Sequence, residues 1–111
     1  AQAVWGAPEG DLLVVGWGGT RGHLQNAVDQ MRAEGKRVSL CHFNYINPLP
    51  HGVRDIFAKF RRTVVCELNE GQFANYLRQN FQEFTYEQYN KCEGLPFTVA
   101  ELVAKFQTLL K

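Results

Sequence analysis

Apolar and polar positions along the chain predict strands and helices in alternation. Leu12 to Val15 form a continuous apolar run that ends at Gly16, a pattern typical of a strand covered on both faces. Apolar residues then recur at helical spacing between Thr20, a candidate N-cap, and Gly35, a candidate C-terminal glycine: Leu24, Ala27, Val28 and Met31. The first unit is therefore predicted to be a strand, a glycine-rich turn and a helix.

The middle of the chain repeats this order. Residues 37–42 are predicted to form a second strand, because apolar positions alternate there with polar ones. Residues 44–50 contain Pro48 and Pro50 and are predicted to be irregular. A helical period returns after them at Val53, Ile56, Phe57 and Phe60. A third strand is predicted over residues 63–68.

Two capping boxes are predicted in the second half. Asn69 and Gln72 have the spacing of a capping box, ahead of a helical face formed by Phe73, Tyr76, Leu77 and Phe81. Residues 84–89 alternate aromatic and polar side chains, as expected of a strand near a sheet edge. Thr98 and Glu101 form the second box, ahead of Val99, Leu102, Val103, Phe106, Leu109 and Leu110. The many aromatic residues here are expected in the core, or in part on a surface that faces a partner.

Repeated alternation of strand and helix predicts a mostly parallel sheet between two helical layers, a three-layer α/β/α domain. In such sheets, ligands lie beyond the carboxyl ends of the strands, where the strand order reverses. The loops expected at that edge are Gly16 to Gly22, His42 to Pro50 and Leu68 to Gln72. Any functional residues are expected in these three loops.

Composition narrows the class of protein. The chain has 111 residues, enough for one domain (1–111), and its net charge of +1 gives no sign of nucleic-acid or anionic-membrane binding. No run reaches the roughly 20 apolar residues of a membrane span. Its three cysteines are odd in number and widely spaced, which favours a reducing cytoplasm. The chain starts at Ala1 without methionine, so we expect a fragment of a larger protein.

The glycine-rich turn resembles phosphate-binding loops but matches neither standard motif. A dinucleotide fingerprint counted from Gly16 has Arg21 where its third glycine belongs. A P-loop would end in Gly-Lys-Ser/Thr, whereas His23 follows Gly22 here. Two interpretations remain open. Backbone N–H groups beside Arg21 could bind an anion, or the turn could only let another backbone approach closely.

No catalytic, cofactor-binding or metal-binding residue is assigned. The cysteines and histidines show neither C-x-x-C nor H-x-x-x-H spacing. Cys41 and Cys66 lie in predicted strands, where a thiol is a small buried side chain. A Cys–His pair would require His42 or His51 to reach Cys66, with no third group to orient it. Glu67, at a strand end, is either solvated or bonded to the N–H groups of a facing loop.

Four segments in order carry a resemblance to a known family. They are "GDLLVVGWGGTRG", "YINPLP", "VVCELNEGQFANYLR" and "NKCEGLPFTVAEL". The chain resembles the C-terminal domain of the alpha subunit of 2-oxoacid:ferredoxin oxidoreductases, most closely the 2-oxoglutarate branch, from about Val4 to Leu110. The combination of "NPLP" with E-x-N-x-G-Q, from Glu67 to Gln72, is the specific part.

The resemblance implies a transketolase C-terminal-like fold with a five-stranded sheet, in which Ala3 to Trp5 form an added antiparallel edge strand. It also implies that thiamine diphosphate, Mg and an iron–sulfur cluster are bound elsewhere in the complete enzyme. Thiamine diphosphate would lie between an earlier domain of the alpha subunit and a separate beta subunit. The implied partners are the rest of the alpha subunit, the beta subunit, ferredoxin and coenzyme A, with no nucleic acid and no membrane.

Such a domain is expected to dock onto the rest of its enzyme. The predicted docking edge comprises Gly16, Gly18, Gly19, Arg21, Pro48, Pro50, Glu67, Asn69, Gly71 and Gln72. Asn69 and Gln72 are expected to cap their helix, which leaves Arg21 and Glu67 free for a partner. Substitution at Gly19, Pro48 or Glu67 is expected to weaken assembly while the domain stays folded. The alternatives are a stand-alone nucleotide-binding module, or the equivalent domain of transketolase or of a 2-oxoacid dehydrogenase beta chain.

Overall fold

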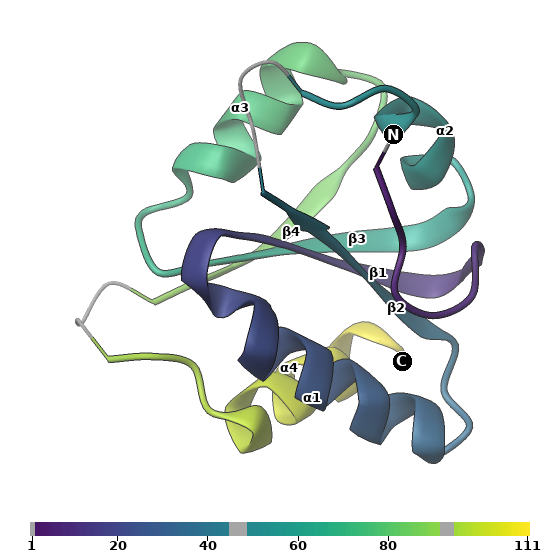
Figure 1. Cartoon of the computed structure of the whole chain (residues 1–111), viewed down its shortest axis with the longest axis vertical. Coiled ribbons are helices and arrows are strands. Elements are labelled where there is room, and N and C mark those ends of the chain that lie inside the picture. Colours follow the sequence, from purple (N-terminus) through teal and green to yellow (C-terminus); the bar gives the residue numbers. More distant parts are fainter. Residues whose placement is uncertain (1, 45–48, 92–94) are drawn as a thin grey trace.

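The computed structural model describes residues 2–44, 49–91 and 95–111, and in these ranges strands and helices alternate (Figure 1). The strands are β1 (Gly10–Trp17), β2 (Val38–Phe43), β3 (Phe60–Glu67) and β4 (Tyr86–Asn90). The helices are α1 (Arg21–Ala33), α2 (Val53–Phe57), α3 (Gln72–Asn80) and α4 (Val99–Leu109), and a 3-10 turn, η1 (Gly18–Thr20), precedes α1. No helix in these ranges is long and apolar enough to span a membrane.

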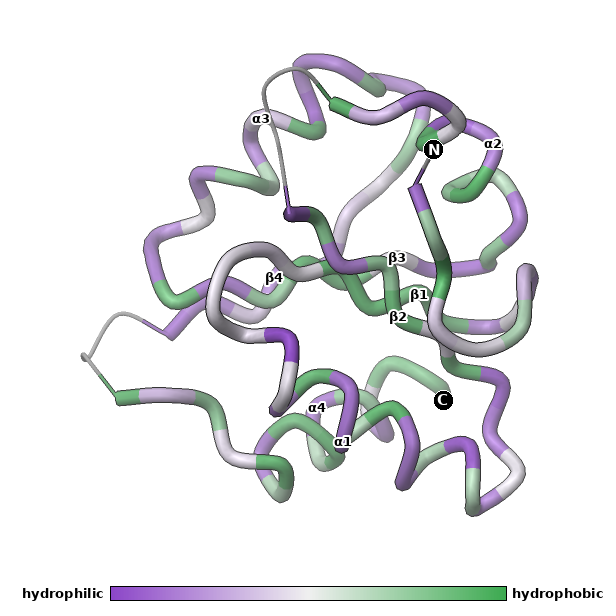
Figure 2. Tube along the Cα trace, in the orientation of Figure 1, coloured by the Kyte–Doolittle hydropathy of each residue, from purple (hydrophilic) through white to green (hydrophobic). Residues whose placement is uncertain are grey.

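The four strands are all parallel, in the order β2-β1-β3-β4. Helices α1 and α4 cover one face of the sheet, and α2 and α3 cover the other (Figure 1). Successive residues of β1 alternate between the two cores: Leu12 packs with α1 and α4, and Leu13 with α2 and α3. This two-sided burial explains the continuous apolar run, which is green at the centre of Figure 2. The predicted three-layer α/β/α fold is confirmed.

The expected fifth strand is reduced to one antiparallel bridge. Trp5 N donates to Leu40 O at 2.7 Å, and Leu40 N donates to Trp5 O at 2.9 Å. Gly6, at φ 112°, then turns the chain away from the sheet. On the other side of the bridge, the side chain of Gln2 donates to His42 O at 2.7 Å, where a paired strand would place a backbone N–H. The sheet therefore has four strands in the described ranges rather than five.

Strand β2 is more buried than its alternating pattern predicts. All six of its residues are buried, including polar Ser39 and His42. Ser39 Oγ donates to Ala7 O at 2.8 Å, and His42 Nε2 lies 3.0 Å from Gly18 O. Both polar side chains can be buried because the N-terminal segment and the turn after β1 supply hydrogen-bond partners.

One predicted helix boundary is wrong, and at another helix the expected side-chain cap is absent. Phe60 was expected on the helical face of α2 but begins β3, where it pairs with Gly10 of β1. Thr20 precedes α1 as expected, yet its hydroxyl donates back to Trp17 O at 3.2 Å and does not cap the helix. At Phe60, pairing with β1 prevails over the helical pattern. At Thr20, the hydrogen bond back to Trp17 replaces the cap.

The aromatic second half belongs mainly to the core. The ring of Phe57 contacts those of Phe81, Phe84 and Tyr86 edge-on, each pair with a centroid separation of 5.8 Å. Strand β4 pairs only with β3 and is an edge strand, as predicted, although it begins at Tyr86 rather than residue 84. Arg78 partly covers this edge by donating to Tyr86 O at 3.2 Å.

The predicted capping box of α4 is confirmed. Glu101 N donates to Thr98 Oγ1 at 3.2 Å, and Thr98 N donates to Glu101 Oε2 at 2.9 Å. The same carboxylate accepts from Lys91 Nζ at 2.8 Å and from the Tyr89 hydroxyl at 3.1 Å. The bond from Lys91, followed by that from the Thr98 N–H, lowers the pKa of Glu101 to about 2.

We expect Glu101→Gln to lower the free energy of unfolding by about 1 kcal/mol at pH 7, because it weakens the cap and removes the charge. A lowered pKa stabilises the fold above the unfolded value of 4.5, and that contribution is lost as the pH falls towards about 2. The difference between parent and variant in urea unfolding should therefore shrink over this range. Glu87→Gln, at an exposed position of β4, is the control. If the difference in unfolding free energy between the parent and Glu101→Gln does not change with pH, the ionised carboxylate of Glu101 does not stabilise the fold in this way.

Candidate functional site

The carboxyl ends of β1 and β3 meet at the centre of the sheet. Strand order reverses between them, because β2 lies on the far side of β1 and β4 on the far side of β3. The turn η1 follows β1, and residues 68–71 follow β3. Two of the three predicted loops therefore meet at the position where open parallel sheets bind ligands.

Glu67, at the end of β3, is buried beneath this edge with 1% of its surface exposed. Its Oε1 accepts from Phe73 N at 2.7 Å, and its Oε2 accepts from Ala74 N at 2.9 Å. The indole N–H of Trp17 also donates to Oε1 at 3.4 Å. The expectation that Glu67 is free to meet a partner is wrong, because its carboxylate is used inside the domain at the start of α3.

The capping box predicted for Asn69 and Gln72 is only half formed among the described residues, and α3 begins later than the box implies. Asn69 Oδ1 accepts from Gly71 N at 2.7 Å and from Gln72 N at 3.0 Å, which forms an Asx turn. Gln72 is the first residue of α3, and the N-cap is Gly71, buried at φ 97°. The N-terminus of α3 is thus satisfied by Asn69 and Glu67 together.

The glycines of the first loop face in two directions. Gly16 is buried, and a Cβ there would collide with Leu24 Cδ1, so this glycine lets α1 pack against the end of β1. Gly18 and Gly19 are exposed, and a Cβ on either would have no atom of residues 2–44, 49–91 or 95–111 within 4 Å. Of these three glycines, Gly18 and Gly19 therefore expose their backbone at the predicted docking edge, and Gly16 does not.

A shallow pocket of about 310 Å³ joins the two loops. It is lined by Trp17, Gly18, Gly19, Thr20, Leu68 and Asn69. Leu68, at its rim, has 44% of its surface exposed. Sequence reasoning missed Trp17, although an aromatic residue inside a glycine-rich turn was a usable signal.

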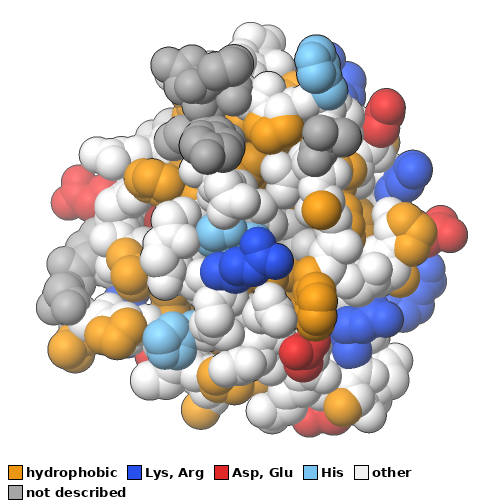
Figure 3. All heavy atoms as spheres, viewed as in Figure 1, with side chains coloured by type: hydrophobic (Ala, Val, Ile, Leu, Met, Phe, Trp, Pro, Cys, Tyr) orange, Lys and Arg blue, Asp and Glu red, His pale blue; other side chains and the backbone are white. Residues whose placement is uncertain are grey.

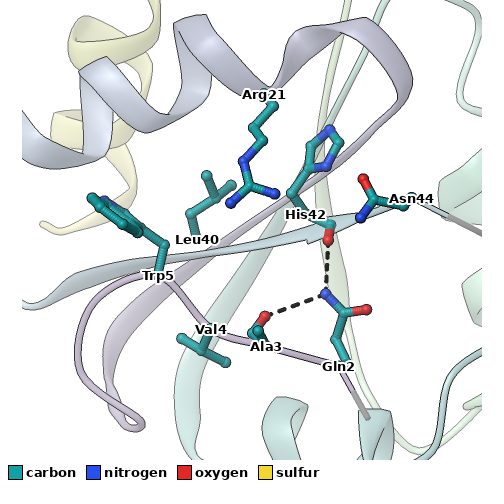
Figure 4. Close-up of a pocket in the computed structure, with 8 residues that line it drawn as sticks. All are labelled: Gln2, Ala3, Val4, Trp5, Arg21, Leu40, His42 and Asn44. Atoms are coloured by element: carbon teal, nitrogen blue, oxygen red, sulfur yellow. Dashed lines mark hydrogen bonds between the residues drawn. The ribbon is translucent and has the colours of Figure 1, made fainter.

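The remaining residues of the predicted docking edge do not join this pocket. Pro48 lies outside the described residues, and Pro50 is half-buried. Arg21 is exposed at the start of α1, but it lines a different pocket beside the N-terminal segment (Figure 4).

The strand order separates His42 from Cys66. β1 lies between β2, which carries His42, and β3, which carries Cys66. Burial raises the pKa of the Cys41 thiol to about 12 and also raises that of Cys66, so both are unreactive thiols. Among the described residues, no three His, Cys, Asp or Glu side chains form a group that could hold a metal ion.

Comparisons with known proteins agree on one family. Residues 10–102 match the family described as pyruvate:ferredoxin oxidoreductase core domain II. The 2-oxoglutarate oxidoreductase subunit KorA of Mycobacterium tuberculosis is 32% identical over 97 residues, covering 86% of this chain. This chain spans only 15% of that relative's length.

Two solved structures share the fold. One is 2-oxoglutarate:ferredoxin oxidoreductase from Magnetococcus marinus, with 2-oxoglutarate, coenzyme A and succinyl-CoA bound. It matches all of this chain and 20% of its own, at 27% identity and a TM-score of 0.92. The other is the alpha chain of a probable 2-oxoacid ferredoxin oxidoreductase from Thermoplasma acidophilum. It matches 98% of this chain and 96% of its own, at 20% identity and a TM-score of 0.68, a likeness of fold alone.

We expect Glu67→Ala to lower the free energy of unfolding by about 2–4 kcal/mol, because two N–H groups at the start of α3 would lose their acceptor. This replaces the expectation that the domain tolerates the change. Urea unfolding of the 111-residue chain measures the effect. Glu70→Ala, an exposed neighbour, should change stability by less than about 0.5 kcal/mol. Equal stability of the two variants would show that the buried bonds contribute nothing.

Proposed function

The chain belongs to the pyruvate:ferredoxin oxidoreductase core domain II family, and from this membership we propose its place in a larger enzyme. We infer that it is the C-terminal domain of the alpha subunit of a 2-oxoglutarate:ferredoxin oxidoreductase. The complete enzyme would oxidatively decarboxylate the 2-oxoacid and form its acyl-CoA. The names of the Mycobacterium and Magnetococcus proteins support the 2-oxoglutarate branch.

Within that enzyme, the domain would serve to dock other parts of the assembly. The observation that carries this proposal is the open backbone at Gly18 and Gly19, beside a pocket walled by Trp17 and Leu68 at the point where strand order reverses. An exposed leucine and an aromatic wall favour contact with another protein surface. Backbone with no side chain above it permits close approach of a partner's main chain.

Thiamine diphosphate, Mg and the iron–sulfur cluster would be bound by other parts of the enzyme. For the metal ion and the cluster, the described residues of this chain offer no converging set of protein ligands. Its two described cysteines are buried in separate strands, and no group of three His, Cys, Asp or Glu side chains converges. The proposed partners are therefore the rest of the alpha subunit and the beta subunit. Ferredoxin and coenzyme A would act on the complete enzyme.

We expect the 111-residue chain to be inactive alone, because the cofactors are proposed to be bound elsewhere in the enzyme and no group of three metal-binding side chains converges in its described part. Incubation with thiamine diphosphate, coenzyme A, 2-oxoglutarate and a viologen dye should give no dye reduction. The complete enzyme under the same conditions is the positive control. Turnover by the domain alone would refute this assignment. Micromolar binding of NAD, FMN or ATP in calorimetry would instead favour a nucleotide-binding module.

We expect Gly19→Arg to weaken subunit association or activity of the complete enzyme by tenfold or more while the domain remains folded. The new side chain meets no atom of the described residues within 4 Å of its Cβ, but it would block a partner's backbone. Association is measured by analytical ultracentrifugation, and folding by urea unfolding of the isolated domain. Gln30→Arg adds the same charge at an exposed position of α1 away from the edge, and should assemble normally. Normal assembly of Gly19→Arg would rule out this edge.

A further inference from the structure

The two edges of the sheet are closed to different degrees (Figure 1). At the β2 edge, the outward carbonyl groups of Val38, Leu40 and His42 each accept a hydrogen bond from another part of the chain. Such bonds prevent an edge strand from pairing with a further strand. At the β4 edge, the hydrogen bond that caps the backbone in the described part of the chain lies at the start of the strand, where Arg78 donates to Tyr86 O at 3.2 Å.

The rest of the β4 edge offers backbone groups that can bind another strand. Lys91 N donates inward to Glu67 O of β3 at 2.8 Å. Because successive residues of a strand direct their backbone groups to opposite sides, Gln88 and Asn90 direct theirs away from β3. Within residues 2–44, 49–91 and 95–111, no hydrogen bond reaches these N–H and C=O groups from outside the sheet. The open part of the edge therefore runs from Gln88 to Asn90.

The sequence from Glu87 to Lys91 complements itself when two copies are placed antiparallel and centred on Tyr89. Gln88 of one copy then faces Asn90 of the other, and each such pair exchanges two backbone hydrogen bonds. Glu87 of one copy faces Lys91 of the other, and the two Tyr89 side chains are neighbours. Opposite charges and aromatic pairs are cross-strand neighbours that stabilise antiparallel strands. This register leaves out the start of β4, where the edge is capped.

The charges beside β4 favour the same pairing. Tyr89 packs against the core beneath α4, and Lys105 Nζ of α4 lies 5.8 Å from the centre of its ring. Lys91 Nζ, on the same face, forms a salt bridge of 2.8 Å with Glu101. Neither Lys105 nor Glu87 forms a salt bridge with another described residue. Two ammonium groups thus face one carboxylate here, and Glu87 of a second copy would supply the other.

The overall charge of the molecule does not oppose such a contact. Acidic and basic side chains are interspersed on the face shown in Figure 3, without a broad area of one sign among the coloured groups. The net charge of the chain is +1. Two copies therefore approach each other without strong long-range repulsion, and the local pattern at β4 determines how they pair.

We propose that the open edge of β4 pairs antiparallel with β4 of a second copy of this chain, centred on Tyr89, which joins two four-stranded sheets into one. The contact between two five-residue strands is smaller than a standard interface, so the dimer is weak, with a dissociation constant on the order of 0.1 mM. The β4 edge is separate from the docking edge at the ends of β1 and β3, so either role can fail alone.

The test follows the 111-residue chain at pH 7 by sedimentation equilibrium, from about 10 µM to about 1 mM. Monomers should give way to dimers over this range. In the dimer, amide hydrogen exchange at Gln88 and Asn90 should slow, because their N–H groups become bonded. An isotope-filtered NOE should link the Hα atoms of Tyr89 in a labelled and an unlabelled copy. A chain that stays monomeric at about 1 mM, or a dimer without this NOE, would overturn the proposal.

Variants of the edge test the register. Glu87→Lys places like charges opposite Lys91 and should raise the dissociation constant at least tenfold. Glu70→Lys makes the same charge change at an exposed position outside β4, and should dimerise like the parent. Gln88→Pro removes an outward N–H group without breaking the ladder to β3, and should also weaken the dimer. Equal dimerisation of Glu87→Lys and Glu70→Lys would overturn the proposal even if Gln88→Pro fails to fold.

Discussion

The buried carboxylate of Glu67 organises the functional edge of this domain. It sits at the end of β3, accepts from two N–H groups at the start of α3, and is contacted by the indole N–H of Trp17 from the end of β1. A helix N-terminus leaves N–H groups unpaired and carries a partial positive charge, so a carboxylate there offsets both costs. One side chain thereby fixes the relative positions of two central strands and a helix where strand order reverses.

Because Glu67 is used internally, the outer surface of the edge consists mainly of backbone and apolar groups. Gly16 faces inward and allows α1 to pack on β1, whereas Gly18 and Gly19 face outward with open space above them. Leu68 stays exposed directly after the buried Glu67. This arrangement suits close contact with another folded surface, since it offers shape and apolar area.

Local and periodic features were predictable from the sequence. Apolar runs identified the central strands because both faces of the sheet are covered, and Thr98 with Glu101 identified the start of α4 because a capping box lies within one turn. Features that depend on distant partners were not predictable. Glu67 finds one of its donors in Trp17, fifty residues away, and the burial of Ser39 depends on Ala7 in the N-terminal segment.

The remaining differences between the prediction and the structure concern which strands are neighbours in the sheet. Periodicity shows which segments are strands but not which strands are neighbours, so it could not show that β1 separates His42 from Cys66. The resemblance implied an antiparallel edge strand over Ala3 to Trp5, yet only Trp5 pairs, since Gly6 turns away and the Gln2 side chain replaces a backbone donor. Whether a distant segment pairs with a strand depends on such contacts, and the spacing of residues along the sequence does not show them.

The turn after β1 connects the two pockets through a single hydrogen bond. Gly18 O faces inward to Nε2 of His42, while the exposed face of Gly18 lines the pocket shared with Leu68. His42 itself is among the residues that line the pocket containing Arg21. The turn is therefore held from within by its carbonyl group, whereas phosphate-binding loops act through their N–H groups. Its glycines are better explained by packing at Gly16 and by open backbone at Gly19 than by a phosphate cradle.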